Sequence, residues 1–403
     1  MQLRHLSLTN FRNFTRLELD LPPGPTLLIG ANAQGKTSLL EALYYLTGAD
    51  SPHTTSDRQL INFLALEEPN PFSRIVAEIK RGERLHRVEI RLQIQDVRGT
   101  SDGRLRKEIL INGVKRRVAD LARAFNAVLF LPQDMAIIEG SPGDRRRLLD
   151  AMISQADPVY GQALTEYGKA LSQRNALLKQ LQERGTSRSQ LEVWDEQLAE
   201  HGAVLLRARG LALHELESLA RPVHEALTGG REKLRLNYAP SLDPLNAGYD
   251  QLDLPLGDPV DRTAVSEAQA RHTILKGLEG ARHRDIERGV TRVGPHRDDL
   301  RFEASGVDLQ LYGSRGQIRT AMLATKIAEV DWLKERTGEW PVLLLDEVLA
   351  ELDAQRRDDL LHHVLEVNQA VLTAADQDMF SPEFRARATL WRVKQGSLRP
   401  YEE

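Results

Sequence analysis

Hydrophobic and polar residues alternate along the first third of the chain in the pattern of half-buried strands. Every second position is apolar in RLELDL (16–21), RIVAEIK (74–80) and HRVEIRLQI (86–94). Continuous apolar runs, which are typical of buried strands, occur in TLLIG (26–30) and AVLFLPQD (127–134). A segment with helical spacing, KTSLLEALYYL (36–46), follows the first run. In EILINGVKRRV (108–118), Asn112-Gly113 between apolar pairs predicts a type I′ hairpin.

The middle of the chain changes to a helical pattern. From about 157 to 227 it is rich in Leu, Ala, Glu, Gln and Arg, with one interruption, RGTSRS at 184–189. This predicts two long helices folded back on each other, the first about 40 Å long at ~1.5 Å per residue. Residues 239–262 are rich in Pro, Gly and Asp and predict a loop, and another helix is expected at 264–288.

Strand patterns return from residue 289. DLRFEASGVDLQLY (299–312) alternates like a hairpin, WPVLLLDE (340–347) has a buried strand before two acids, and ARATLWRVKQG (386–396) predicts a last strand. We therefore predict an α/β fold split by a helical insert, with boundaries at 1–150, 151–288 and 289–403.

Composition limits the class of protein. The net charge of −4 over 403 residues argues against a uniformly basic nucleic-acid coat, so a nucleic-acid site would be a local patch. The absence of cysteine excludes disulfides and cysteine-bound zinc. No stretch approaches the ~20 apolar residues that span a bilayer. A soluble, cytoplasmic protein without membrane contact is expected.

The segment GANAQGKT (30–37) carries the clearest chemistry. It matches G-x-x-x-x-G-K-[ST] in full and stands between a predicted strand and a predicted helix, which is the structural context that this phosphate-binding loop needs. Backbone N–H groups of 31–36 would cradle the phosphates of ATP, Lys36 would contact the outer phosphates, and Thr37 would bind Mg²⁺. The full set of expected ATP contacts in this segment is Gly30, Ala31, Asn32, Ala33, Gln34, Gly35, Lys36, Thr37 and Ser38.

Two acids after an apolar run complement this loop. In VLLLDEV (342–348), Asp346 would hold Mg²⁺ at the end of a buried strand, and Glu347 would orient or deprotonate the attacking water. Catalysis is therefore assigned to Glu347 and Lys36.

A second phosphate-like corner lies in YGSRGQIRT (312–320). The amphipathic helix that follows would direct its N-terminus, Ser314 and the amides near Gly316 at an anion. This layout resembles the signature motif of ATP-binding-cassette ATPases, with Arg315 in place of the first glycine. The resemblance implies a split ATPase head of mixed sheets around the P-loop. It also implies that Ser314, Gly316, Gln317 and Asp353 contact the ATP of a second subunit.

The same resemblance gives a role to Gln133 after AVLFLP, as a contact of Mg²⁺ or of the attacking water. The histidine usual after the next strand is replaced by alanines in LTAAD (372–376).

Longer stretches narrow the resemblance. They are LTNFRNF at the start, LPQDMAIIEGSPGDRRRLLD (131–150), RNALLKQL (174–181), GPHRDD (294–299) and LLLDEVLAELDAQRRDDLL (343–361). Together they resemble the RecF family of bacterial recombinational-repair ATPases, nearly end to end. The resemblance implies an ATP contact by Arg12, an ATP-dependent homodimer, slow hydrolysis, and binding of duplex, gapped or junction DNA. It also implies RecO and RecR as partners in loading recombinase at gaps.

Basic clusters flank the Asn112-Gly113 hairpin. They are Arg104, Arg106 and Lys107 on one side and Lys115, Arg116 and Arg117 on the other. Few aromatic residues accompany them, which favours contact with a duplex backbone over base stacking. A solvated charged face is the alternative. His296 in GPHRDD has no second ligand that would argue for a metal, and the role of this loop stays open.

Two other functions fit parts of this pattern. An ATPase subunit of a membrane transporter would separate Gln133 from Ser314 by a compact helical subdomain, whereas here the two residues are 181 positions apart and the segment between them has an arm-like pattern. A structural scaffold would not need Glu347 and Thr37. A GTPase is disfavoured because no N-K-x-D motif is present.

Overall fold

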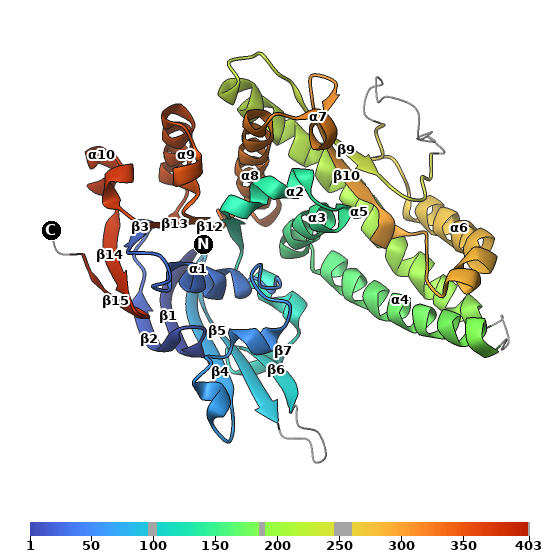
Figure 1. Cartoon of the computed structure of the whole chain (residues 1–403), viewed down its shortest axis with the longest axis horizontal. Helices are drawn as coiled ribbons and strands as arrows, with labels where there is room; N and C mark the ends of the chain where they lie inside the picture. Colours follow the sequence, from blue (N-terminus) through green and yellow to red (C-terminus); the bar gives the residue numbers. More distant parts are fainter. Residues whose placement is uncertain (96–102, 185–189, 246–259, 402–403) are drawn as a thin grey trace. The chain divides into compact units, whose positions relative to one another are not determined.

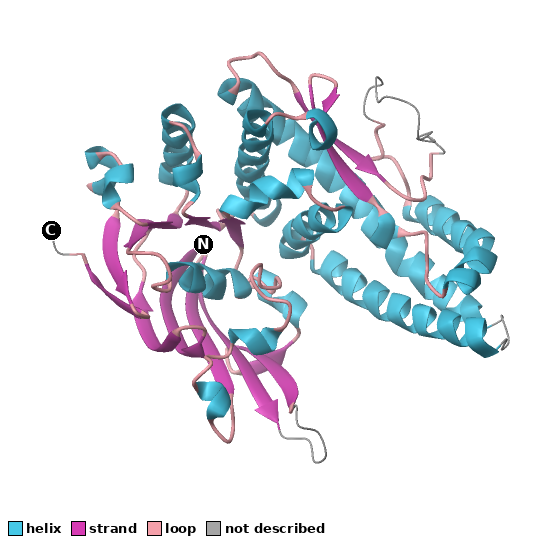
Figure 2. Cartoon of the chain, viewed as in Figure 1, coloured by secondary structure: helices cyan, strands magenta, loops and turns pink. Residues whose placement is uncertain are grey.

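The computed structural model describes residues 1–95, 103–184, 190–245 and 260–401. Its contacts divide the chain into two compact units, residues 1–133 with 333–403 and residues 134–332 (Figure 1). Strands predominate in the first unit and helices in the second (Figure 2). In the described ranges, no helix has the length and apolar content to cross a membrane. The three-part division at 150 and 288 stays a prediction; the chain passes between the two compact units at 133/134 and 332/333.

The first unit contains an antiparallel sheet of six strands in the order β2-β1-β4-β5-β6-β7. Its strands are β1 (Gln2–Phe11), β2 (Phe14–Asp20), β4 (Phe72–Arg81), β5 (Arg84–Gln95), β6 (Arg104–Ile111) and β7 (Val114–Arg116). The predicted hairpin is confirmed, since Asn112 and Gly113 have φ of 53° and 77° between β6 and β7. Residues 96–102, between β5 and β6, lie outside the described residues.

A second six-stranded sheet has the order β15-β14-β3-β13-β12-β8. Its strands are β3 (Gly24–Ile29), β8 (Ala127–Phe130), β12 (Val342–Asp346), β13 (Gln369–Ala374), β14 (Thr389–Lys394) and β15 (Ser397–Pro400). The strands from β14 to β8 run parallel, and β15 pairs antiparallel with β14. The unit's helices are α1 (Lys36–Tyr45), α9 (Ala354–Glu366) and α10 (Pro382–Arg385).

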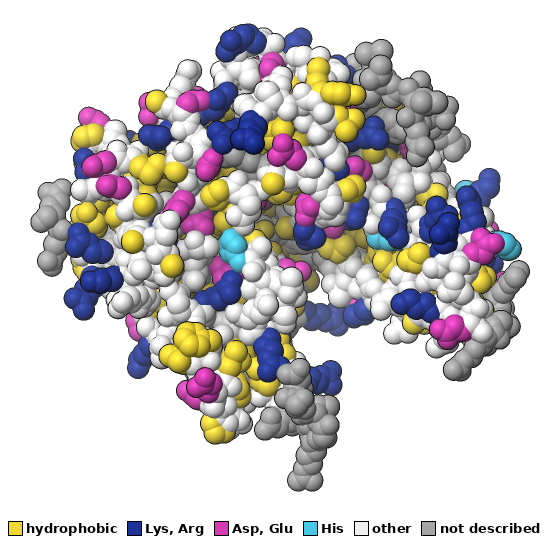
Figure 3. Space-filling model, in the orientation of Figure 1, with side chains coloured by type: hydrophobic (Ala, Val, Ile, Leu, Met, Phe, Trp, Pro, Cys, Tyr) yellow, Lys and Arg dark blue, Asp and Glu magenta, His cyan; other side chains and the backbone are white. Residues whose placement is uncertain are grey.

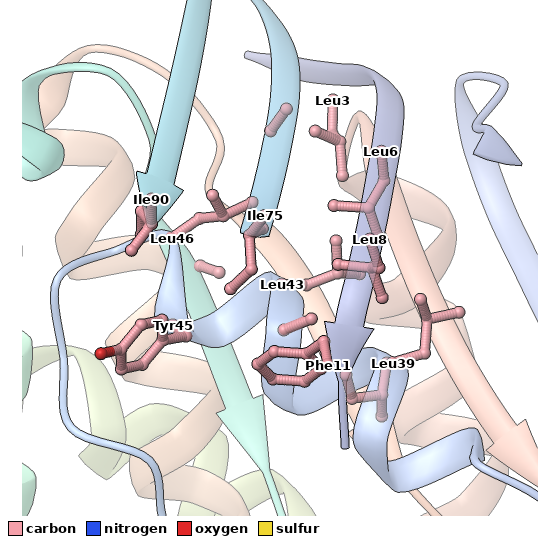
Figure 4. Close-up of a cluster of buried hydrophobic side chains, with 14 of the residues drawn as sticks. Leu3, Leu6, Leu8, Phe11, Leu39, Leu43, Tyr45, Leu46, Ile75 and Ile90 are labelled. Atoms are coloured by element: carbon pink, nitrogen blue, oxygen red, sulfur yellow. The ribbon is translucent and has the colours of Figure 1, made fainter. Parts of the chain in front are cut away.

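The core of this unit joins helix α1 to both sheets. Figure 4 shows Leu39 and Leu43 of α1 among Leu6 and Leu8 of β1 and Ile75 of β4. The same buried cluster continues into the parallel sheet, through side chains of β8, β12 and β13. Because α1 is packed on both sides, the loop that leads into it from β3 is held at a fixed place.

The second unit is mostly helical. Its helices are α2 (Met135–Glu139), α3 (Pro142–Ala156), α4 (Pro158–Arg184), α5 (Gln190–Leu227), α6 (Glu267–Arg288), α7 (Leu309–Tyr312) and α8 (Arg315–Thr337, whose last turn belongs to the first unit). Its sheet consists of β9 (Leu234–Ala239), β10 (Asp299–Ala304) and β11 (Val307–Asp308), in the order β11-β10-β9. Short 3-10 helices lie in both units, at Asp57–Leu60, Ala65–Glu67, Val118–Arg123, Pro132–Asp134, Pro295–Arg297, Val348–Glu351 and Gln377–Met379.

The pattern-based predictions for this unit are confirmed with one correction. Helices α4 and α5 pack against each other, as predicted for the long helical pair. The interruption at 185–189 and most of the predicted loop, 246–259, lie outside the described residues. The predicted hairpin at 299–312 is wrong in its second half, where LQLY forms α7. Asp308 accepts a hydrogen bond from the backbone N–H of Gln310, which starts a helix in place of a longer strand.

Candidate functional site

The loop between β3 and α1 has the backbone that a phosphate cradle needs. Ala33 and Gly35 have φ of 62° and 112°, both in the left-handed region. A Cβ on Gly35 would lie 2.5 Å from Asn13 Nδ2, and one on Gly30 would lie 2.4 Å from the backbone oxygen of Val393. Close approach therefore requires glycine at both positions, and the left-handed φ is a second reason for glycine at position 35. The first N–H groups of α1 have no partner within the helix and are directed at the loop, where phosphate would bind.

Lys36 is buried at the start of α1, with 3% of its surface exposed. Its Nζ donates to the backbone oxygens of Gly30 at 2.5 Å and Ala31 at 3.0 Å, so the side chain folds back over the loop. Nζ also lies 2.9 Å from Oε1 of Glu347. The predicted phosphate-binding lysine and the predicted catalytic acid, 311 residues apart in sequence, are therefore in direct contact.

Asp346 and Glu347 are positioned by a residue that the sequence did not single out. Thr373, on β13, donates from Oγ1 to Asp346 Oδ1 at 2.7 Å and accepts from the backbone N–H of Glu347 at 3.0 Å. Glu347 has a left-handed φ of 51°, which turns its side chain out of the strand direction. Its carboxylate remains partly exposed, whereas Asp346 is buried. In the sequence, the hydroxyl of Thr373 within the apolar run VLTAA (371–375) is the feature that could have indicated this role.

The residues present fit a magnesium ion. Asp346 uses Oδ1 for Thr373, which leaves Oδ2 as a ligand, and the hydroxyl of Thr37 stands next to Lys36 at the half-buried start of α1. Mg²⁺ commonly takes one or two protein oxygens and keeps several waters. In the described ranges, no group of three or more His, Asp or Glu side chains is placed to hold a metal ion.

Arg12 is anchored to the helix of the phosphate loop. Its Nε and Nη2 donate to the two carboxylate oxygens of Glu41 at 2.6 and 2.9 Å, and Glu41 is buried on α1. Its Nη1 donates to the backbone oxygen of Gln59 at 3.3 Å. This two-point contact fixes the guanidinium against α1, and the next residue in the chain, Asn13, lies close to Gly35 of the phosphate loop. Glu41 is a further positioning residue that the sequence pattern did not reveal.

Gln133 stands apart from this cluster in its contacts. It is exposed in the 3-10 helix Pro132–Asp134, and its Nε2 lies 3.4 Å from Nδ1 of His53. Across the described residues, no hydrogen bond joins Gln133 to Asp346 or Glu347. Its assignment to Mg²⁺ or water therefore stays a prediction.

The second phosphate-like corner is the start of α8, in the other unit. Ser314 Oγ accepts from the backbone N–H of Gln317 at 3.2 Å, and Gln317 Oε1 accepts from the N–H of Ser314 at 2.9 Å. This reciprocal cap fixes the helix start. Ser314 and Gly316 are both exposed, while Gln317 also donates to Glu232 at 3.0 Å. The corner is thus a built helix N-terminus open to solvent, with Ser314 at its edge.

Asp353 caps helix α9 in the first unit. Its Oδ1 accepts from the backbone N–H of Arg356 at 3.0 Å, and its other oxygen pairs with the Arg356 guanidinium. The backbone hydrogen bond, aided by the arginine charge, lowers the pKa of Asp353. The exposed carboxylate is therefore negative at neutral pH and available to a partner.

Comparison with known proteins decides the family. The family model described as the RecF/RecN/SMC N terminal domain matches residues 2–396. The DNA replication and repair protein RecF of Chloroflexus aurantiacus is 41% identical over 99% of this chain and 99% of its own length. The chain belongs to the RecF family. The RecF protein of Bacillus subtilis is 35% identical over 99% of this chain and 100% of its own length.

Solved structures agree with this membership. The recombination mediator protein RecF-ATPrS in the RecFOR pathway is similar with a TM-score of 0.82 at 31% identity, covering 100% of this chain and 98% of that chain. The Smc head bound to the C-winged helix domain of ScpA reaches a TM-score of 0.51 at 14% identity, which shows the fold alone. The predicted family, the ATPase-head fold class and the prediction of an ATPase of the RecF and SMC type are confirmed.

The basic hairpin of this RecF-family chain is partly neutralised by its own acids. Glu108, on β6, lies 3.7 Å from Arg106 and 3.6 Å from Lys115. Lys107 lies 3.4 Å from Asp57 and stacks over the ring of Tyr45 at 4.3 Å. The remaining three cations, for which the described ranges offer no acidic partner, are Arg104, Arg116 and Arg117. Alternation along the strands also places Lys107 and Arg106 on opposite faces of the sheet.

The GPHRDD loop has a structural role. Gly294 has a φ of 120°, and a Cβ there would lie 2.6 Å from the hydroxyl of Tyr167. That hydroxyl lies 2.7 Å from Nδ1 of His296, whose Nε2 lies 3.1 Å from the backbone oxygen of Thr291. Burial lowers the pKa of His296 to about 4, so the ring is neutral at pH 7.

Asp298 of the same loop is buried and joins distant segments. It accepts from the backbone N–H of Ser241 at 2.7 Å and from the hydroxyl of Tyr238, and lies 3.5 Å from Arg209 Nη1. The adjacent Asp299 pairs with both nitrogens of the Arg145 fork at 2.8 and 2.9 Å. The loop thus ties β9, β10, α3 and α5 together.

Thr373→Val is expected to slow ATP hydrolysis by about 10- to 100-fold, the usual effect of losing a group that orients a metal ligand. The change removes the donor to Asp346 and leaves the N–H of Glu347 unpaired. Thr26→Val on the neighbouring β3 is the matched control, since its buried hydroxyl has no partner among the described residues. Phosphate release measures both variants, and parent-level activity in Thr373→Val would contradict the assigned role.

Proposed function

We propose that this chain is an ATP-dependent DNA-binding repair protein of the cytoplasm. It dimerises on ATP, hydrolyses ATP slowly, and helps to load recombinase at gapped DNA together with RecO and RecR. The main structural support is the contact between Lys36 and Glu347 at 2.9 Å, beside the Asp346–Thr373 pair. Membership of the RecF family, and the ATP-bound RecF structures of the RecFOR pathway, support it.

The proposed hydrolysis uses residues of the first unit. The amides of 31–36 hold the phosphates of ATP, and Lys36 neutralises charge on the outer phosphates. Thr37 and Asp346 hold Mg²⁺, which supplies further charge neutralisation when bound. Glu347 accepts a proton from water as the water oxygen bonds to the γ-phosphorus and the bond to the bridging oxygen breaks. The products are ADP and inorganic phosphate.

Dimerisation is proposed to depend on the second corner together with Asp353 at the start of α9. Ser314, Gly316, Gln317 and Asp353 contact the ATP held by the phosphate loop of the partner subunit. An exposed helix N-terminus attracts an anion, and Ser314 adds a hydroxyl donor. The arrangement explains why one chain carries two phosphate-binding corners in different units. ATP would then act as part of the interface, so that its hydrolysis releases the dimer.

DNA binding is proposed for the hairpin clusters and is tested through its dependence on salt. Replacing Lys115, Arg116 and Arg117 together by glutamine is expected to lower the log–log salt slope of duplex binding by about 1 to 2. The decrease falls short of the full 0.9 per cation because Lys115 already pairs with Glu108. Binding to labelled duplex over a salt series measures the slope, and an unchanged slope would make these residues a solvated face.

The proposed function as a whole is tested by gel shift of gapped, duplex and single-stranded DNA. We expect ATP with Mg²⁺ to increase binding to gapped and duplex DNA and to change binding to single strands much less. Equal binding with and without ATP would contradict an ATP-gated function. The Lys36→Ala protein provides the control, because its DNA binding should no longer respond to ATP.

A further inference from the structure

Helix α6 presents two flanks of opposite character in the helical unit. Its buried residues, Ala270, Ile274, Leu278, Ala281 and Asp285, form one stripe that packs mainly against α5 and also contacts α4. The residues on either side of this stripe carry most of the helix's cations. The cations on one side pair with acids, whereas those on the other side have no acidic partner in the described ranges.

The first flank is neutralised by helix α5. Arg271 pairs with Glu196, and Arg282 lies 2.8 Å from Asp195 and 3.8 Å from Glu192. The charges of these arginines are therefore already compensated by acids of α5, which leaves them less able to attract an anionic ligand.

The second flank carries a row that is not neutralised. Lys276, Gly280, Arg284 and Arg288 follow each other at intervals of four residues, so neighbouring members of this row lie on the same side of the helix. All four are exposed, and in the described ranges none of the three cations pairs with an acid. Two acids lie on the adjoining surface, of which Glu287 pairs with His283 at 3.3 Å and Glu279 is exposed. Figure 3 shows Lys and Arg side chains gathered over α6.

The row has the chemistry of a polyanion site. Arg284 and Arg288 are separated by about 6 Å along the helix, and Lys276 lies about 12 Å from Arg284, at 1.5 Å per residue. Between them, Gly280 has open space around it, so a ligand backbone can approach the helix closely. Helix α6 contains no Phe, Tyr or Trp on which a base could stack. This composition suits the phosphates of a duplex better than exposed bases.

We propose that Lys276, Arg284 and Arg288, the α6 row, bind the phosphate backbone of duplex nucleic acid. The proposal rests on the DNA-binding function proposed above and assigns it a second contact surface, on the helical unit. Each unpaired cation displaces counterions from the duplex when it binds. The α6 row should therefore contribute more per residue than the hairpin clusters, whose cations Arg106, Lys107 and Lys115 already have acidic partners.

The test compares two full-length variants that lose the same charge. Lys276→Gln/Arg284→Gln/Arg288→Gln removes the α6 row. The control, Arg147→Gln/Lys169→Gln/Arg271→Gln, removes three cations that pair with Asp144, Glu166 and Glu196. Fluorescence anisotropy with a labelled duplex and ATP, over a potassium chloride series, gives the log–log slope. We expect the slope to fall by about 2 to 3 in the row variant and to stay near the parent value in the control.

Each outcome bears on a separate claim. An unchanged slope in the row variant, or an equal loss in the control, overturns the assignment to α6 while DNA binding by the parent stands. A parent protein that binds no duplex at any salt concentration overturns this assignment together with the proposed DNA-binding function. ATP-dependent dimerisation of both variants, measured by light scattering, shows that neither substitution set disturbs the fold.

Discussion

Glu347→Gln is expected to hydrolyse ATP at least about 100-fold more slowly than the parent and to form a longer-lived dimer with ATP. A positioned general base contributes about 10²- to 10⁴-fold, and glutamine keeps the shape of the side chain without the basic carboxylate. The contact with Lys36 at 2.9 Å places this side chain at the phosphate loop. Because ATP is proposed to join the two subunits, slower hydrolysis should prolong their association.

Phosphate release measures the rate of hydrolysis, and light scattering measures how long the dimer lasts. Glu366→Gln is a suitable control, since it removes an exposed acid on α9 that pairs with His363 at 3.5 Å. A Glu347→Gln protein that stays monomeric with ATP would contradict the link between hydrolysis and release. Hydrolysis at the parent rate would remove Glu347 from the mechanism.

Lys36→Ala and Ser314→Arg are expected to fail at different steps. Lys36 contacts the phosphates of its own chain's ATP, and a hydrogen bond to a charged group is worth about 1.5–3 kcal/mol, so its loss should weaken nucleotide binding by about 10- to 100-fold. Ser314→Arg leaves the phosphate loop untouched, and the monomer should bind ATP as the parent does. The bulky cation at the exposed start of α8 should instead prevent assembly.

Titration with a fluorescent ATP analogue and light scattering separate these effects. The double variant should show weak nucleotide binding and no assembly. A Ser314→Arg monomer that fails to bind ATP would contradict the assignment of Ser314 to the partner's nucleotide.

The parts of the site that could be predicted from sequence are those built by neighbouring residues. The phosphate loop forms between a strand and the next helix, so GANAQGKT carries its own context. Asp346 ends the buried strand β12 and Glu347 comes next, so the apolar run was enough to place both acids. The hairpin at Asn112-Gly113 could be predicted for the same reason, because its turn depends on two adjacent residues.

The parts that could not be predicted depend on pairing between distant strands and helices. Thr373 reaches Asp346 because β12 and β13 align these two residues in register, and no local pattern gives that alignment. Glu41 holds Arg12 across 29 residues. The GPHRDD loop has partners from α3 to β9, so its role depends on the whole helical unit.

The corner at Ser314 is proposed to act on the ATP of the other subunit. Mixing Ser314→Arg with Lys36→Ala tests it most directly, at high protein concentration and with a slowly hydrolysed ATP analogue. In the mixed dimer, one composite site joins an intact phosphate loop to an intact Ser314 corner, and the other carries both defects. We expect ATP-dependent association in the mixture that neither variant shows alone. If mixing restores no association, the corner acts within its own chain and the account is contradicted.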